Sequence, residues 1–256
     1  MSLPDFVIVG AMKCGTSTLH AQLAEQGRFF MSEPKEPNFF SDDYVYAKGL
    51  AWYRGLFDAA GPGQIKGEAS THYAKRPTYR DCMARLLETL PDIKIVYMMR
   101  HPVDRLISHY IHEWTMAVIS APIDEAIGRH PELIDYSRYA YQLEPFIEAY
   151  GRARVLPVFL ERMNAFPDEE LSRVSRFLGG ADARWKTDLG DQNVSRDRIR
   201  NFPLRGLLVD HPVAAGLRRA LAPRWLRDRV KARFQMRERP VLSPQTRAAV
   251  EKTFDE

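Results

Sequence analysis

A short glycine-containing segment near the N-terminus carries the residue types that bind phosphate groups. It reads GAMKCGTSTL over residues 10–19, so two glycines precede three consecutive hydroxyl residues. Glycines let the backbone turn tightly here, and the first amides of a helix that begins after them can face an anion. Lys13 adds a mobile positive charge, and the hydroxyls of Thr16, Ser17 and Thr18 can donate to phosphate oxygens. We therefore predict that this segment binds an anion.

The segment differs from the loop that binds nucleoside triphosphates with magnesium. That loop has lysine directly after its second glycine, followed by a serine or threonine that binds the metal. Here Thr16 follows Gly15, and the lysine lies at position 13. The strand expected to supply an acidic residue for magnesium is followed by Arg100 instead. A magnesium-dependent kinase or ATPase is thus disfavoured, and so is a turn that binds no ligand, because lysine and hydroxyls cluster on it.

A second group of anion-binding residue types lies in the segment RHPVDRLISHY, residues 100–110. Arg100 leaves a predicted strand, and Arg105 and Ser108 lie one turn apart on the following helix, so they share a face. Arg100 and Ser108 can hold a dianionic phosphate by charge and hydrogen bonds. For Arg105, phosphate binding and pairing with an acidic neighbour on its own helix both remain open.

The elements that must position these residues alternate between strand and helix. Apolar runs typical of buried parallel strands occupy 6–9, 93–98 and 155–159, with a weaker run at 64–67. Helical patterns lie at 16–26, 78–90, 102–117, 138–150 and 167–178. This alternation predicts an α/β fold: a single P-loop-like domain with a central, mostly parallel sheet flanked by helices. Such folds bind ligands at the carboxyl ends of their strands, where both anion-binding segments lie.

Four segments, in this order and spacing, resemble the sulfotransferases that use 3′-phosphoadenosine 5′-phosphosulfate (PAPS), especially bacterial members similar to the heparan-type Golgi enzymes. They are KCGTSTL at 13–19, KEPNFF at 35–40, GEASTHY at 67–73 and RHPVDRLISHY at 100–110. The resemblance extends from Asp5 to Phe202 and implies transfer of a sulfuryl group from PAPS to a hydroxyl or amine of an acceptor, without a metal. The residues that it implies for donor binding are Lys13, Cys14, Gly15, Thr16, Ser17, Thr18, Arg100 and Ser108.

The resemblance also implies the catalytic residues. In-line transfer depends mainly on positioning and charge stabilisation, because the nucleotide phosphate is already a good leaving group. Lys13 is expected to neutralise the leaving phosphate, and Lys35 to contact the transferring sulfuryl oxygens. Glu68 is expected to lie near both lysines and to act as general base towards the acceptor. His72 is the alternative base, since imidazole suits proton removal near neutral pH.

Two basic segments follow the last predicted strand. Arg196 and Arg198 lie where the family often carries a second loop for the 3′-phosphate, so ligand binding and a solvated loop both remain open. Residues 205–240 are predicted to form a basic helical subregion. Within it, the arginine-rich stretch 217–239 has apolar residues at helical spacing. Packing on the domain, binding of an acidic glycan and contact with an anionic membrane surface all remain open for this stretch.

Composition excludes several other classes of protein. Lys and Arg total 37 against 33 Asp and Glu, and a net charge of +4 is far from that of a dedicated nucleic-acid binder. Two cysteines rule out a disulfide scaffold and favour a reducing compartment. The short apolar run near the N-terminus has neither a preceding basic region nor a cleavage site. We therefore expect a cytoplasmic protein in which residues 1–256 form one sulfotransferase domain.

Two other functions remain open: a P-loop kinase-like phosphotransferase and a non-catalytic module that binds a nucleotide or glycan. The lysine position opposes the first, and the presence of Glu68 and His72 opposes the second. The acceptor is a carbohydrate, a lipid or a small molecule, with a glycan or glycolipid favoured. His109, His112 and Glu113 lie on neighbouring helix positions, but no metal site is expected. The amphipathic pattern that stops at Glu256 favours a chain that continues further.

Overall fold

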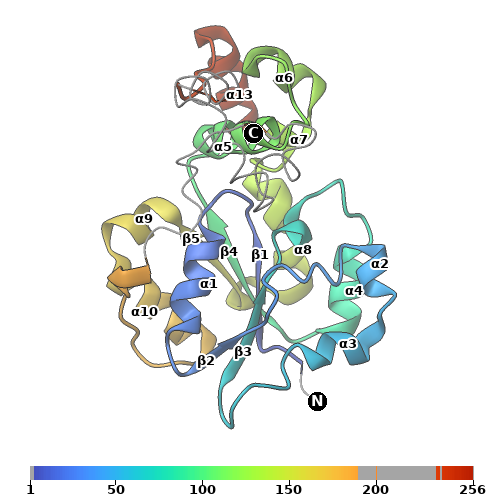
Figure 1. The fold of residues 1–256 in the computed structure, drawn as a ribbon, viewed down its shortest axis with the longest axis vertical. Helices are drawn as coiled ribbons and strands as arrows, with labels where there is room; N and C mark the ends of the chain where they lie inside the picture. Colours follow the sequence, from blue (N-terminus) through green and yellow to red (C-terminus); the bar gives the residue numbers. More distant parts are fainter. Residues whose placement is uncertain (1–2, 190–199, 201–234, 237, 256) are drawn as a thin grey trace, which may run out of the picture.

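The computed structural model describes residues 3–189, 200, 235–236 and 238–255 of the 256 residues. A parallel five-stranded sheet lies at its centre, with the strand order β2-β3-β1-β4-β5 (Figure 1). The predicted α/β fold with a parallel sheet is therefore confirmed. The strands are β1 (Phe6–Gly10), β2 (Phe29–Met31), β3 (Ile65–Ala69), β4 (Lys94–Met99) and β5 (Val155–Phe159).

The predicted strands are all present, and one further strand was missed. The apolar runs at 6–9, 93–98 and 155–159 form β1, β4 and β5, while the weaker run at 64–67 overlaps the start of β3. Every residue of β1 is buried, as expected of a central strand covered on both faces. The strand β2 escaped prediction because its three residues are too few to show a pattern.

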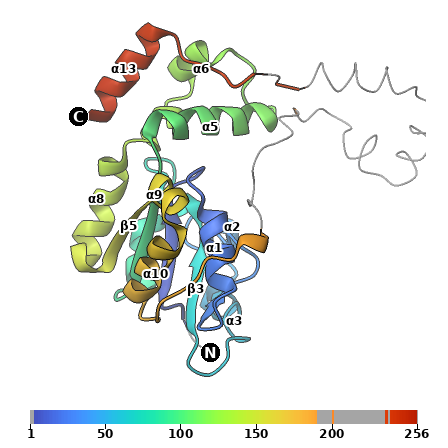
Figure 2. The same cartoon turned by 90° about the vertical axis from the view of Figure 1, so that its left-hand side faces the viewer.

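Helices cover both faces of the sheet (Figures 1 and 2). On one face lie α1 (Thr16–Ala24), α9 (Leu160–Ala165) and α10 (Pro167–Leu178). On the other face lie α2 (Asp43–Tyr46), α3 (Gly49–Gly55), α4 (Cys82–Thr89) and α8 (Tyr139–Tyr150). Short 3-10 helices join some of these elements, namely η1 (Thr71–Ala74), η2 (Arg152–Arg154) and η3 (Thr187–Leu189).

A further group of helices lies beyond the carboxyl ends of the strands (Figure 2). Its members are α5 (Pro102–Thr115), α6 (Ile123–Arg129), α7 (Glu132–Asp135) and α13 (Pro244–Asp255). They share an apolar cluster that includes Leu106, Leu133 and Val250. Because α5 begins shortly after β4, these four helices cover the edge of the sheet where the predicted ligand-binding segments lie. We call α5, α6, α7 and α13 the roof.

The five helices predicted from the sequence correspond to α1, α4, α5, α8 and α10, with boundaries that differ by a few residues. Shorter helices such as α3 and α9 were not predicted.

Arg196, Arg198 and nearly all of the basic subregion 205–240 lie outside the described residues. The proposal of one domain over 1–256 stays a prediction. Among the described residues, no helix is long and apolar enough to cross a membrane.

Candidate active site

A cavity of about 920 Å³ opens at the carboxyl ends of the strands, between the sheet and α5. Its walls come from the loop after β1, the start of α1, the loop after β2, η1, α5 and α9. Trp185 and Arg239 complete the lining. Open parallel sheets bind ligands at this edge, so the cavity lies where the fold favours a site.

The loop after β1 has the conformation that an anion-binding turn requires. Gly15 precedes α1 with a φ of +85°, a value that favours glycine. A Cβ atom at this position would lie 2.8 Å from Cδ1 of Leu160, so a side chain would also collide with α9. The turn directs the first residues of α1, Thr16, Ser17 and Thr18, to the cavity. Helix N-termini carry unpaired amides and partial positive charge, which favour an anion.

Cys14 is the one predicted donor-binding residue of this loop that does not line the cavity. Its thiol is fully buried, with Sγ 3.5 Å from the hydroxyl oxygen of Tyr139. Burial raises the pKa of this thiol to about 11, so it stays protonated at neutral pH. The Cys14 side chain therefore belongs to the core beneath the loop, and a ligand contact from it is not supported.

Two cations face the cavity from neighbouring strands. Lys13 follows β1 and Arg100 follows β4, and both line the cavity with Ser108 of α5. Burial and then the positive charge of Arg100 lower the pKa of Lys13. Neither cation forms a salt bridge within the described part of the chain. Two positive groups that repel one another and take part in no described salt bridge are arranged to bind an anionic ligand.

Arg105 neither lines the cavity, as phosphate binding would require, nor forms a salt bridge with an acidic residue of its own helix in the described part of the chain. Its side chain is fully buried outside the cavity, where Nε donates to Oγ of Ser137 at 2.5 Å and an amino group donates to the carbonyl of Leu133 at 2.7 Å. These bonds tie α5 to α7, which contains Leu133, and to the segment between α7 and α8, which contains Ser137. Asp104, its acidic neighbour, pairs instead with Arg239.

The structure corrects the predicted position of Glu68. Its side chain is fully buried and does not line the cavity. Three hydroxyl groups donate to it, those of Tyr53 at 2.6 Å, Ser70 at 2.8 Å and Tyr73 at 3.1 Å, and burial raises its pKa to about 7. The expected approach to Lys13 and Lys35 is wrong because alternate residues of a strand face opposite sides, and this one faces α3.

Glu36 is the carboxylate that does line the cavity beside η1, and it was missed from the sequence. Its backbone has a φ of 58°, its amide donates to the carbonyl of Ala69 at 2.9 Å, and Thr71 donates to Oε2 at 3.3 Å. Nζ of Lys35 lies 2.7 Å from Oε1. Burial raises the pKa of Glu36, but the charge and hydrogen bond of Lys35 outweigh it, so the net shift is downward. Glu36 is therefore ionised at neutral pH.

His72 and Lys75 complete this wall of the cavity. The His72 ring stacks on Tyr79 at a centroid distance of 4.8 Å, and burial, followed by the charge of Lys75, lowers its pKa to about 4. Burial likewise lowers the pKa of Lys75 to about 8. At neutral pH the wall thus carries a neutral imidazole. Lys35 was also predicted to face the ligand, but it forms a salt bridge with Glu36 and does not itself line the cavity.

The opposite wall is formed by α5, which presents His112 and Glu113. Nε2 of His109 lies 3.4 Å from Oε1 of Glu113, and this hydrogen bond is the main reason that the pKa of Glu113 is lowered. Within the described residues, no group of three or more His, Cys, Asp or Glu side chains is arranged to hold a metal ion.

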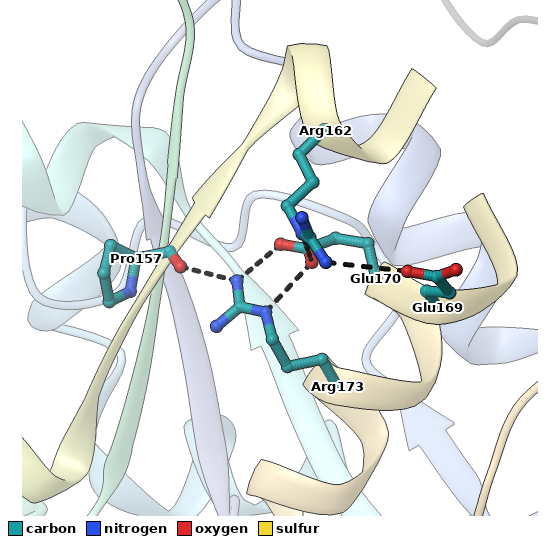
Figure 3. Close-up of polar contacts among 5 residues, drawn as sticks. All are labelled: Pro157, Arg162, Glu169, Glu170 and Arg173. Atoms are coloured by element: carbon teal, nitrogen blue, oxygen red, sulfur yellow. Dashed lines mark hydrogen bonds and ion pairs between the residues drawn. The ribbon is translucent and has the colours of Figure 1, made fainter. Parts of the chain in front are cut away.

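A buried charge cluster holds α9, which supplies the remaining wall, against α10 and β5 (Figure 3). Glu170 of α10 is fully buried and accepts hydrogen bonds from Arg162 of α9 at 2.9 Å and from Arg173 at 2.5 and 3.0 Å. Arg173 also donates to the carbonyl of Pro157 in β5 at 2.8 Å. The cluster fixes the helix that brings Leu160 into the cavity.

Trp185 is a second lining residue that the sequence did not reveal. The loop that carries it is bound to α1, since the side chain of Gln22 donates to the carbonyl of Lys186 and accepts from its amide, both at 2.8 Å. Trp185 itself donates its amide to Asp168 at 2.7 Å. These contacts hold an aromatic side chain beside the anion-binding loop, although Gln22 and Lys186 lie 164 residues apart in the sequence.

Comparison with known proteins finds similarity over almost the whole chain. Residues 3–254 match the family profile described as a sulfotransferase domain. Heparan sulfate glucosamine 3-O-sulfotransferase 3B1 of Mus musculus is 32% identical over 220 residues, which cover 78% of this chain and 51% of the relative. The corresponding human protein is also 32% identical over 220 residues. The chain therefore spans about half the length of the curated relatives that it matches.

Solved structures give a consistent result. A sulfotransferase from Alicyclobacillus acidocaldarius is 26% identical, with a TM-score of 0.63, and the alignment covers 74% of this chain and 89% of that one. A mouse sulfotransferase complexed with PAP is 12% identical, with a TM-score of 0.53, and covers 98% of this chain. The alignment covers 82% of the mouse chain, and at this identity the likeness concerns the fold alone.

Proposed function

The chain belongs to the sulfotransferase family, and from this premise we propose that it transfers a sulfuryl group from PAPS to a hydroxyl or amine group of a glycan. One observation carries the proposal: Lys13 and Arg100 face a single cavity beside the N-terminus of α1. Within the described residues they have no salt-bridge partner, so a ligand with several anionic groups suits them. The named relatives support the glycan, because one acts on glucosamine of heparan sulfate.

The residues present fit this donor. The first amides of α1, with Lys13 and the hydroxyls of Ser17 and Thr18, suit the 5′-phosphosulfate. Arg100 and Ser108, which enter from β4 and α5, suit the 3′-phosphate. Trp185 offers an aromatic face to the adenine. The cavity of about 920 Å³ lies within the range of about 300–1,000 Å³ that is usual for small-molecule sites.

We assign the general base to Glu36, because this carboxylate lines the cavity and its pKa is lowered. PAPS, when bound, supplies a sulfuryl group on a phosphate that leaves readily. Glu36 takes the proton of the acceptor group as that group attacks sulfur, and Lys35 keeps Glu36 ionised beforehand. Lys13 neutralises the charge that develops on the leaving phosphate. His72, which is neutral at pH 7, is the second candidate for the base.

Paired variants test this assignment. Glu36→Gln keeps the shape of the side chain but removes its basicity, so turnover should fall by about 10²–10⁴-fold. His72→Asn should be much milder. The measurement is transfer of a labelled sulfuryl group from PAPS to heparan sulfate oligosaccharides. PAP, the nucleotide left after transfer, should bind both variants as it binds the unaltered protein.

Each contrary result would identify a separate error. Near-native turnover of Glu36→Gln together with an inactive His72→Asn would move the base to His72. Tight binding of PAP by the unaltered protein without transfer to any glycan would remove the glycan acceptor and leave the donor site in place.

A further inference from the structure

Glu68 is a fully buried carboxyl group whose described partners are all hydroxyl groups. Oε1 accepts from Tyr53 at 2.6 Å and from Tyr73 at 3.1 Å, and Oε2 accepts from Ser70 at 2.8 Å. In its ionised form, Glu68 offers acceptor sites on both oxygens and no donor. Each hydroxyl can therefore direct its proton to Glu68, which leaves the lone pairs of that hydroxyl free to accept another hydrogen bond.

Two of these hydroxyls use their free lone pairs to hold the segment 36–40. Oγ of Ser70 accepts from the amide of Asn38 at 3.1 Å, and the hydroxyl of Tyr73 accepts from the amide of Phe40 at 3.4 Å. The Tyr53 hydroxyl has no hydrogen bond to this segment in the described part of the chain. The buried carboxylate thus reaches amides of the segment by hydrogen bonds through Ser70 and Tyr73 but not through the Tyr53 hydroxyl. The Tyr53 ring packs on Phe39 and Phe40 at centroid distances of 4.6 and 5.1 Å, a contact that a phenylalanine at position 53 would keep.

The segment needs such support because its backbone is unusual. Glu36 has a φ of 58° and Asn38 a φ of 53°, in the left-handed region that residues other than glycine adopt only where the surroundings hold them. Ala69 and Thr71, the neighbours of Ser70 in the chain, also bind Glu36, through a carbonyl at 2.9 Å and a hydroxyl at 3.3 Å. The end of β3 and the segment 36–40 therefore form one hydrogen-bonded unit.

We propose that Glu68 is a positioning residue, which acts through two hydroxyl groups to hold the segment that presents Glu36 to the cavity. This inference rests on the proposed function, in which Glu36 accepts the proton of the acceptor. The carboxylate orients the hydroxyls of Ser70 and Tyr73, and they in turn fix the amides of the segment. Loss of either hydroxyl lets the Glu36 carboxylate move relative to the acceptor. The residues proposed to bind the donor keep their positions.

A matched pair of tyrosine variants separates this role from simple loss of a buried hydrogen bond. Tyr73→Phe and Tyr53→Phe each remove one hydroxyl that donates to Glu68, but only Tyr73 also accepts from the segment. Tyr73→Phe and Ser70→Ala should lower kcat by about 10–10²-fold, the effect of a misplaced catalytic group. Tyr53→Phe should leave kcat nearly unchanged, and all three should bind PAP normally. Equal losses of kcat in the two tyrosine variants would overturn the proposal.

Glu68→Gln tests the carboxylate itself. The amide has one acceptor oxygen and adds a donor, so it cannot receive all three hydroxyl protons. We expect kcat to fall at least as far as in Ser70→Ala, with PAP affinity retained as the check on folding. If Glu68→Gln does not fold, the Ser70 and Tyr73 variants decide the question. Native kcat in a folded Glu68→Gln protein would contradict the proposal.

A double-mutant cycle shows whether the effect passes through Glu36. Ser70→Ala is combined with Glu36→Gln, and single-turnover rates are measured with labelled PAPS. The Ser70 change should have almost no further effect once the base is absent. The same fold-loss in both backgrounds would mean that Ser70 acts independently of Glu36 and would refute the positioning role. A native rate for Glu36→Gln alone would instead refute the base assignment in the proposed function.

Discussion

At the residue scale, the cavity carries charges of both signs, contributed by different elements. Lys13 and Arg100 gather near the start of α1, and burial followed by the charge of Arg100 lowers the pKa of Lys13. Glu36 lies on the wall formed by η1 and the loop before it, where Lys35 keeps it ionised. Lys13 and Arg100 suit an anionic donor, and the Glu36 carboxylate, beside which Lys75 also lies, suits an acceptor that must lose a proton.

Replacement of Arg100 by alanine tests the end that binds the donor. A hydrogen bond to a charged group is worth about 1.5–3 kcal/mol, which corresponds to about 10–10²-fold in affinity. Arg100→Ala should lose that much affinity for PAP, and Ser108→Ala should lose less. Affinity for adenosine 5′-phosphosulfate, which lacks the 3′-phosphate, should hardly change in either variant. Titration calorimetry with both nucleotides is the measurement, and an equal loss for the two would mean that Arg100 contacts another part of the donor.

Most of the residues predicted to bind the donor line the cavity, whereas the predicted base, Glu68, does not. Lys13, Thr16 and Arg100 directly follow strands or begin a helix, and such positions lie at the ligand-binding edge whatever the details of packing. Glu68 was placed there by the same reasoning, but it lies within β3, and the alternation of the strand directs it into the core. Glu36 lies in the KEPNFF segment that was singled out in the sequence, but the left-handed backbone conformation of this residue between β2 and α2 could not be read from that pattern.

At the element scale, α9 depends on one buried charge cluster for its position beside the cavity (Figure 3). Burial raises the pKa of Glu170, but the hydrogen bonds and charges of Arg173 and Arg162 outweigh it and lower the pKa below its usual value of 4.5. A carboxyl group with a lowered pKa in the folded state stabilises the protein above its unfolded pKa. That stabilisation is lost as the pH falls from 4.5 through the lowered value.

Glu170→Gln should therefore destabilise the protein at neutral pH. We expect a loss of about 2–3 kcal/mol in the free energy of unfolding, below the ~3–5 kcal/mol typical of a fully buried pair because both arginines are partly exposed. The difference between the variant and the unaltered protein should shrink as the pH falls below 4.5. Urea unfolding at several pH values measures it.

Glu169→Gln is the matched control, because the neighbouring glutamate pairs with the same Arg162 at 3.6 Å but is 69% exposed. This variant should have nearly the stability of the unaltered protein. A loss equal to that of Glu170→Gln, or a loss that does not depend on pH, would contradict the role given to the buried cluster.

The longer elements were predictable because their patterns are long enough to read. The helix α5 combines a proline at its start with a regular apolar face, and both features were visible in the sequence. The helix α9 has six residues and α2 only four, so neither shows a full amphipathic repeat. Such short elements form because neighbouring contacts hold them, and those contacts are known only from the fold.

At the scale of the whole molecule, α5, α6 and α13 lie above the sheet (Figure 2). The cavity is lined both by the loops at the carboxyl ends of the strands and by α5. The helices α5, α6 and α13 share an apolar cluster of their own, so this roof packs independently of the core around the sheet. Arg239, which precedes α13 in the chain, lines the cavity and pairs with Asp104 of α5. The residues proposed to bind the donor come from the sheet side and from α5, so a bound donor would bridge the two.

The most direct test of the central claim is titration of the protein with PAP in excess chelator. In the described cavity, Lys13 and Arg100 take part in no salt bridge and lie beside the N-terminus of α1. These groups can bind an anion without a metal. We therefore predict tight binding of PAP that is unchanged by the chelator, and much weaker binding of ATP with magnesium. Loss of PAP binding on chelation, or equal affinity for ATP with magnesium, would contradict the assignment of this site to a sulfuryl donor.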